Sequence, residues 1–145
     1  MTRTIAFSTT AIVIVTLALL PQSVNAAGGG PSGAYKDSGD GASENKRIVF
    51  SCNWKPTRQV SRCTARYSGT GDGAPARIVG TFQHKTYVFN GFWIESKSNS
   101  KCRKTKGNSH YWGRVKFVFQ RDLKSWKGKW NYCSNPLKHS WNGKK

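Results

Sequence analysis

Short runs of alternating apolar and polar residues dominate the chain after residue 46. Apolar side chains occupy every second position from Val115 to Phe119, and the same spacing recurs from Trp126 to Tyr132. A period of two is that of a β-strand with one buried face, whereas an amphipathic helix repeats every three to four residues. Gly, Pro, Asn and Ser separate the runs, as turn residues do between strands. The pattern predicts six strands, over residues 47–54, 60–67, 76–83, 86–95, 111–120 and 126–133.

Six short strands separated by turns favour an all-β fold, either a small antiparallel β-barrel or a β-sandwich. The last two predicted strands form the most regular hairpin, with residues 122–125 as a four-residue loop. A one-residue slip would move every side chain to the other face, so the register must bring the two apolar sets together. We therefore expect Phe117 opposite Trp130, Val115 opposite Tyr132 and Phe119 opposite Gly128.

The N-terminal residues follow a different pattern. A single positive charge, Arg3, precedes an apolar run over residues 11–20, and Pro21 and the small-residue pattern of residues 24–26 follow it. These are the three parts of a secretory signal peptide. The run is half the ~20 apolar residues that a membrane-spanning helix needs. Residues 1–26 are predicted to be cleaved, giving a secreted or periplasmic protein without a membrane span in its mature form.

The rest of the chain divides into two predicted parts. Residues 27–45 are rich in Gly, Ser and Ala and lack an apolar period, so we predict a flexible linker there. Residues 46–145 have the length of one domain, and they form the predicted basic β domain.

Four cysteines, Cys52, Cys63, Cys102 and Cys133, all lie in the exported part. An even number of cysteines in a small exported domain indicates disulfides, and four allow three pairings. We favour Cys52–Cys63 with Cys102–Cys133, because the first pair flanks a predicted hairpin. No close C-x-x-C pair is present to suggest zinc, and no cofactor is predicted.

The charge of the β domain is far from balanced. Of the 24 Lys and Arg residues, only Arg3 and Lys36 precede residue 46, which leaves 22 against Asp72, Glu95 and Asp122, a formal net charge of +19. This excess of cations is larger than solubility requires. Clustered Lys and Arg with interleaved aromatic residues are typical of proteins that bind polyanions.

Two groups of cations are the candidate polyanion-binding residues. The alternation places the first group on the polar side of the last hairpin, here called the hairpin face: Arg114, Lys116, Lys127 and Lys129. The second group lies in the polar loop of residues 96–108: Lys97, Lys101, Arg103, Lys104 and Lys106. Trp112 and Trp141 do not fit the core alternation and are predicted to be exposed aromatic contacts. The predicted partner is an anionic polymer or cell-envelope surface: extracellular nucleic acid, lipopolysaccharide or acidic polysaccharide.

Two other functions remain open from the sequence. The abundance of Trp also fits a lectin-like domain that stacks exposed Trp or Tyr on glycans. A small secreted ribonuclease would use His84 and His110 as acid and base with Lys85 beside the phosphate, but no spacing marks these residues as a pair. The few carboxylates also argue against a glycosidase. The protein is therefore predicted not to be an enzyme.

Overall fold

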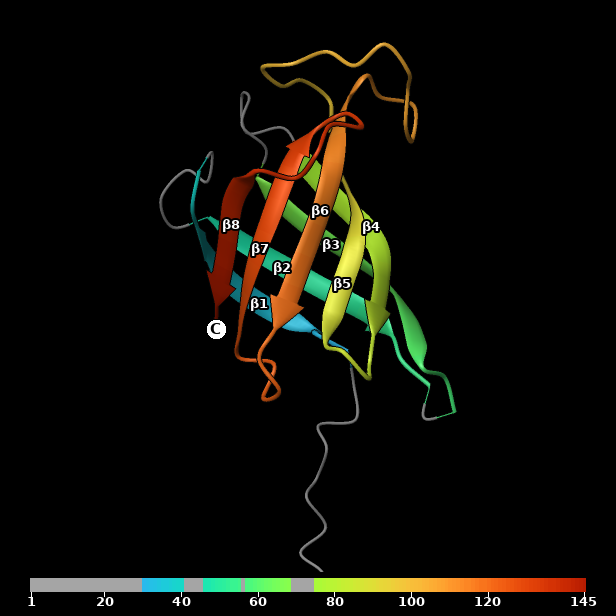
Figure 1. Cartoon of the computed structure of the whole chain (residues 1–145), viewed down its shortest axis with the longest axis vertical. Helices are drawn as coiled ribbons and strands as arrows, with labels where there is room; N and C mark the ends of the chain where they lie inside the picture. The colour runs from blue at the N-terminus through green and yellow to red at the C-terminus, as the bar shows by residue number, and fades with distance from the viewer. Residues whose placement is uncertain (1–29, 41–45, 56, 69–74) are drawn as a thin grey trace, which may run out of the picture.

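A computed structural model describes residues 30–40, 46–55, 57–68 and 75–145 of the chain; the predicted signal peptide lies outside them. Eight antiparallel strands, each paired with its neighbours in chain order, close into a barrel (Figure 1). The strands are β1 Gly33–Ser38, β2 Arg47–Asn53, β3 Val60–Ser68, β4 Pro75–Gln83, β5 Val88–Glu95, β6 Tyr111–Phe119, β7 Ser125–Tyr132 and β8 His139–Lys144. The described part of the chain contains no helix long and apolar enough to cross a membrane.

The all-β class and the barrel are confirmed, but the number of strands is eight and not six. The six predicted strands correspond to β2 through β7. The prediction of a linker over residues 27–45 is wrong for residues 33–38, which form β1. Only Tyr35 interrupts its small and polar residues with a large apolar side chain, so β1 has no apolar period. Pairing with β2 on one side and β8 on the other holds this segment extended and closes the barrel.

The predicted register of the last hairpin is wrong by two residues. In the structure Val115 lies opposite Trp130, Phe117 opposite Gly128 and Phe119 opposite Trp126. Gly128 explains the shift, because a Cβ there would lie 2.3 Å from the Phe117 ring. A two-residue shift keeps every side chain on its predicted face. The aromatic side therefore still faces the core, and the basic side still faces outward.

Aromatic rings fill much of the barrel. Phe50 makes edge-to-face contacts with Tyr35, Phe89, Phe117 and Phe119 at centroid distances of 5.7–6.1 Å. Such arrangements suit the ring quadrupoles and add to the apolar area that each ring buries. An eight-stranded barrel is just wide enough to be filled by side chains or to hold one small ligand.

Both predicted disulfides are confirmed. Cys52 and Cys63 are direct partners of β2 and β3, and their Cα atoms lie 4.0 Å apart. Cys102 and Cys133 join the long β5–β6 loop to the end of β7. Two disulfides are consistent with an oxidising extracellular or periplasmic compartment.

Candidate polyanion-binding surface

The hairpin face lies on the outside of the barrel. Lys116 is directly opposite Lys129, Lys127 is opposite Val118, and Arg114 is opposite Asn131. All four cations are exposed, because their neighbours along β6 and β7 point into the aromatic core. The structure therefore brings together the first group of predicted residues.

Charge of opposite sign is separated between the two sides of the barrel wall. All ten Lys and Arg residues of the eight strands are exposed. The only acidic residues in these strands, Asp37 and Glu95, are buried and point inward. No carboxylate from a strand therefore neutralises the outer surface.

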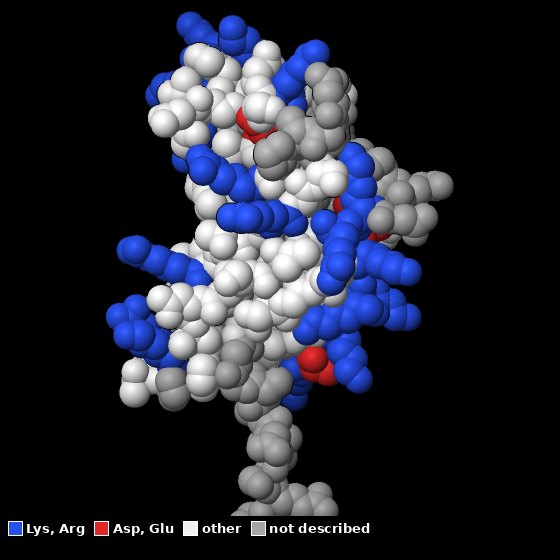
Figure 2. Space-filling model, turned by 180° about the vertical axis from the view of Figure 1, so that it is seen from behind, with Lys and Arg blue, Asp and Glu red and all other residues white. Residues whose placement is uncertain are grey.

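Cations also cover the side of the barrel away from the hairpin face. Figure 2, which looks at the molecule from behind, shows several groups of Lys and Arg, most of them toward the edges of this face, and few acidic atoms. The sequence analysis did not select these strand cations: Lys36, Arg47, Arg62, Arg66, Arg77 and Lys144. For the four arginines the alternation signalled an outward direction, whereas Lys36 and Lys144 lie in the two strands without a visible period. Which of these cations are neighbours depends on the register between strands.

One line of polar side chains crosses six neighbouring strands on the outer surface. Each member is the register partner of the next from β3 to β8. This outer polar row consists of Arg62, Thr81, Asn90, Lys116, Lys129 and Ser140. An extended polymer lying across the strands would meet hydrogen-bond donors along this row and cations at three of its positions.

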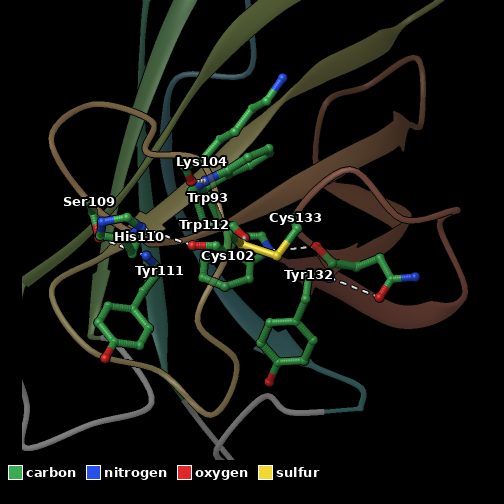
Figure 3. Close-up of a disulfide and its surroundings, with 10 residues drawn as sticks. Trp93, Cys102, Lys104, Ser109, His110, Tyr111, Trp112, Tyr132 and Cys133 are labelled. Atoms are coloured by element: carbon green, nitrogen blue, oxygen red, sulfur yellow. Dashed lines mark hydrogen bonds between the residues drawn. A yellow bond between two sulfur atoms is a disulfide. The ribbon is translucent and has the colours of Figure 1, made fainter.

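The long loop between β5 and β6 is fixed to the barrel by several interactions. Figure 3 shows the Cys102–Cys133 disulfide beside Trp93 and Trp112. The backbone N–H of Cys102 donates to the carbonyl oxygen of His110 at 2.8 Å, and Ser109 Oγ donates to the carbonyl oxygen of Glu95 at 2.5 Å. The loop therefore holds its cations in a defined place at the end of the barrel (Figure 1).

The loop cations have two different environments. Lys97, Lys101, Arg103 and Lys104 are exposed. Lys106 is half-buried, and its Nζ lies 3.7 Å from the centre of the Phe92 ring and 5.2 Å from that of Trp112. Phe92 is the register partner of Arg114. This cation–π contact therefore places Lys106 next to the hairpin face and connects the two groups of cations.

The two tryptophans predicted as exposed contacts are buried. Trp112 is 6% exposed, because the loop covers the outer side of β6 and the indole Nε1 donates to the carbonyl oxygen of Lys104 at 2.7 Å. Trp141 is 7% exposed and points into the barrel from β8, a strand that the sequence analysis missed. Neither ring has a free face for stacking on a polymer or a glycan, so their prediction as exposed contacts is wrong.

A surface pocket at the rim of the barrel contains two arginines that are direct partners on β3 and β4, Arg66 and Arg77. The pocket has a volume of about 550 Å³ and is closed on one side by residues 107–109. The guanidinium of Arg77 donates to the carbonyl oxygen of Gly107 at 2.9 Å, which orients its planar fork. Paired guanidinium groups suit phosphate, sulfate and carboxylate groups, which they can bind through two parallel hydrogen bonds.

The residues considered for a nuclease lie apart. His84 follows β4 and shares a hydrogen bond of 2.8 Å between Nε2 and Ser61 Oγ. His110 precedes β6, at the other end of the barrel, and its Nδ1 lies 2.9 Å from the carbonyl oxygen of Cys102. The structure therefore does not bring the two imidazoles together. Within the described ranges, no group of three or more His, Cys, Asp or Glu side chains is placed to hold a metal ion.

Comparison with known proteins identifies no relative. No protein-family model matches the chain, and neither the curated proteins nor the solved structures give a significant match.

Proposed function

We propose that this protein is an exported, non-enzymatic binding protein that captures anionic polymers or cell-envelope surfaces by electrostatic contact. The observation that carries the proposal is the separation of charge across the barrel wall. Ten strand cations point outward, whereas both strand carboxylates point inward. A rigid wall with one sign of charge attracts polyanions and releases their bound counterions, which gives affinity that depends strongly on salt.

Two parts of the surface contribute different contacts. The hairpin face and the outer polar row offer lysines to an extended chain of negative charges. The pocket between Arg66 and Arg77 offers bidentate donors to a single phosphate, sulfate or carboxylate group. Together they suit a polymer with regularly spaced anionic groups better than an isolated anion.

The carbohydrate-binding alternative is not supported by a specific observation. It depended on exposed aromatic planes, and the two side chains proposed for that role are buried. Stacking on neutral sugars would then have to use half-buried rings, such as those of Trp54, Tyr87, Tyr111 or Trp130.

Retention on immobilised heparin tests the proposal. We expect the mature protein to elute only at high salt, and its affinity for a single-stranded oligonucleotide should also fall steeply as the salt concentration rises. Elution at the low salt typical of a weakly basic protein would contradict the proposal, as would salt-independent binding to neutral glycans in the same array.

The arginine pocket has its own test. Arg66→Gln with Arg77→Gln should weaken heparin binding more than Arg47→Gln with Lys144→Gln, which removes the same charge from positions outside the pocket. Equal effects of the two pairs would show that the pocket has no special part in binding.

A further inference from the structure

The interior of the barrel has a chemistry opposite to that of its surface. Asp37 on β1 and Glu95 on β5 both point inward, and no Lys or Arg of the eight strands does. Buried carboxylates are costly unless they are paired or hydrogen-bonded. Glu95 accepts a hydrogen bond of 2.9 Å from the hydroxyl of Tyr67. Asp37 is less completely satisfied.

Asp37 has one free carboxylate oxygen. Its Oδ2 accepts a hydrogen bond from Trp141 Nε1 at 3.3 Å, but its Oδ1 has no partner although the side chain is only 6% exposed. Burial raises the pKa of this carboxyl group, and the smaller opposing effects, of which the hydrogen bond from Trp141 is the largest and the charge of Lys46 another, do not cancel that rise. The site therefore favours either a proton or a cation at Asp37.

An unpartnered donor lies two strands away from this unpartnered acceptor, on the other side of β8. The indole Nε1 of Trp126 is buried and has no hydrogen-bond partner. Asp37 and Trp126 are the register partners of Gly143 on its two sides, and a Cβ on Gly143 would lie 2.4 Å from Trp126 Nε1. The two unsatisfied atoms therefore flank one backbone position on the inner wall. Few buried polar groups in folded proteins lack partners, so a donor and an acceptor of this kind on one inner wall point to a polar ligand.

Aromatic rings surround the two carboxylates. The ring of Tyr67 packs against Trp141 at 5.3 Å between centroids. These rings and the carboxylates retain 6–9% of their surface exposed, whereas Phe89 and Phe117 in the deep core are at 0%. The arginine pocket also reaches the inward-facing Glu95. The part of the interior around Asp37, Tyr67 and Trp141 is therefore less completely enclosed than the deep core, although Trp126 beside it is only 2% exposed. Its walls offer ring faces that attract cations.

We propose that this interior site, formed by Asp37, Trp126, Trp141, Tyr67 and Glu95, binds a small protonated amine that also carries a hydroxyl group. The ammonium donates to Asp37 Oδ1, and the hydroxyl oxygen accepts from Trp126 Nε1. The faces of Tyr67 and Trp141 add cation–π attraction. A bridging water would satisfy both polar atoms, but it would bring no positive charge to the buried carboxylate, whose pKa stays raised in spite of Lys46. This site borders the arginine pocket at Glu95 but uses none of the outer cations, so it does not depend on polyanion binding.

Ethanolamine is the probe, with ethylamine lacking the hydroxyl and ethylene glycol lacking the ammonium. Binding to the mature protein is followed by calorimetry and by tryptophan fluorescence at physiological salt. We expect saturable binding of ethanolamine, several-fold weaker binding of ethylamine, and none of ethylene glycol. Absence of saturation with ethanolamine, or equal affinity for all three compounds, would overturn the proposal.

Two variants separate the proposed contacts. Asp37→Asn should weaken ethanolamine binding at least tenfold, whereas Asp122→Asn, which alters an exposed carboxylate in the β6–β7 turn, should not. Trp126→Phe keeps a ring but removes the donor, so it should abolish the preference for ethanolamine over ethylamine. Circular dichroism shows whether each variant folds. If Asp37→Asn does not fold, the preference of Trp126→Phe for ethanolamine over ethylamine tests the assignment by itself. An unchanged preference in folded Trp126→Phe, or unchanged affinity in folded Asp37→Asn, would refute the assignment.

Discussion

Neutralising the hairpin face should change the salt dependence of polyanion binding by a calculable amount. The perturbation is the triple variant Lys116→Gln, Lys127→Gln and Lys129→Gln. All three side chains are exposed, and Lys116 and Lys129 are direct partners. Surface substitutions of this kind typically change stability by less than ~0.5 kcal/mol, so the barrel should remain folded.

The magnitude follows from counterion release. Each phosphate of a single strand that is neutralised by the protein contributes about 0.7 to the slope of log affinity against log salt. Loss of three such contacts should therefore reduce the slope by about 2. Between 50 and 200 mM salt, the wild type should lose roughly 20-fold more affinity for a single-stranded oligonucleotide than the variant does.

A matched control distinguishes a binding face from overall charge. Lys36 is the register partner of both Arg47 and Lys144, so these three cations form a second exposed cluster on β8, β1 and β2. Changing them to Gln removes the same charge on another side of the barrel. Fluorescence anisotropy at four salt concentrations should give the control a slope close to that of the wild type. Equal losses in the two triple variants would refute a discrete hairpin face, and a larger loss in the control would move the site to the second cluster.

Three further predictions concern stability. The Cys102–Cys133 disulfide closes a loop of 31 residues and the Cys52–Cys63 disulfide one of 11 residues. Replacing each pair with Ser should therefore lower the free energy of unfolding by about 3.7 and about 2.8 kcal/mol, respectively, by the chain-entropy relation. Urea unfolding of the two double variants checks this order. Burial raises the pKa of Tyr35 and Tyr67 above the ordinary value of 10.0, and the charges of Asp122 at Tyr35 and of Glu95 at Tyr67 add to the rise. The contribution of each tyrosine to stability is therefore complete below pH 10 and should fall by ~1.4 kcal/mol per pH unit above it, a slope that Phe at either position should reduce. Gly128→Ala should destabilise the barrel by roughly 1–3 kcal/mol because its Cβ would overlap the ring packed there, and an unchanged unfolding midpoint would contradict the packing described.

The sequence predicted the strands that carry their own alternation and missed those that do not. In β8, only Trp141 is a large apolar residue among the three that point inward, His139, Trp141 and Gly143, so the sequence shows no period of two there. The same holds for β1, where Asp37 occupies an inward position. Both segments become strands because closing the barrel supplies partners on each side, and this long-range pairing leaves no local pattern.

The sequence predicted which face of the sheet the candidate cations lie on, but it did not predict which cations are neighbours on adjacent strands. Alternation alone gave the outward direction of Lys116 and Lys129, and a two-residue error in register left that direction unchanged. The pocket between Arg66 and Arg77 needed the register of β3 against β4 and the position of the long loop. Neither is encoded in a local period.

The interior site was missed for a related reason. Asp37 lies in a stretch whose composition is typical of a linker, where a carboxylate is expected to be solvated. Once barrel closure turns that position inward, the same residue becomes a buried charge with an unsatisfied oxygen. Burial raises the pKa of Asp37 and opposes its ionised form, so the carboxylate is costly at this position unless a positive charge accompanies it. Keeping a carboxylate there while every strand cation points outward is therefore better explained by a ligand of positive charge than by folding alone.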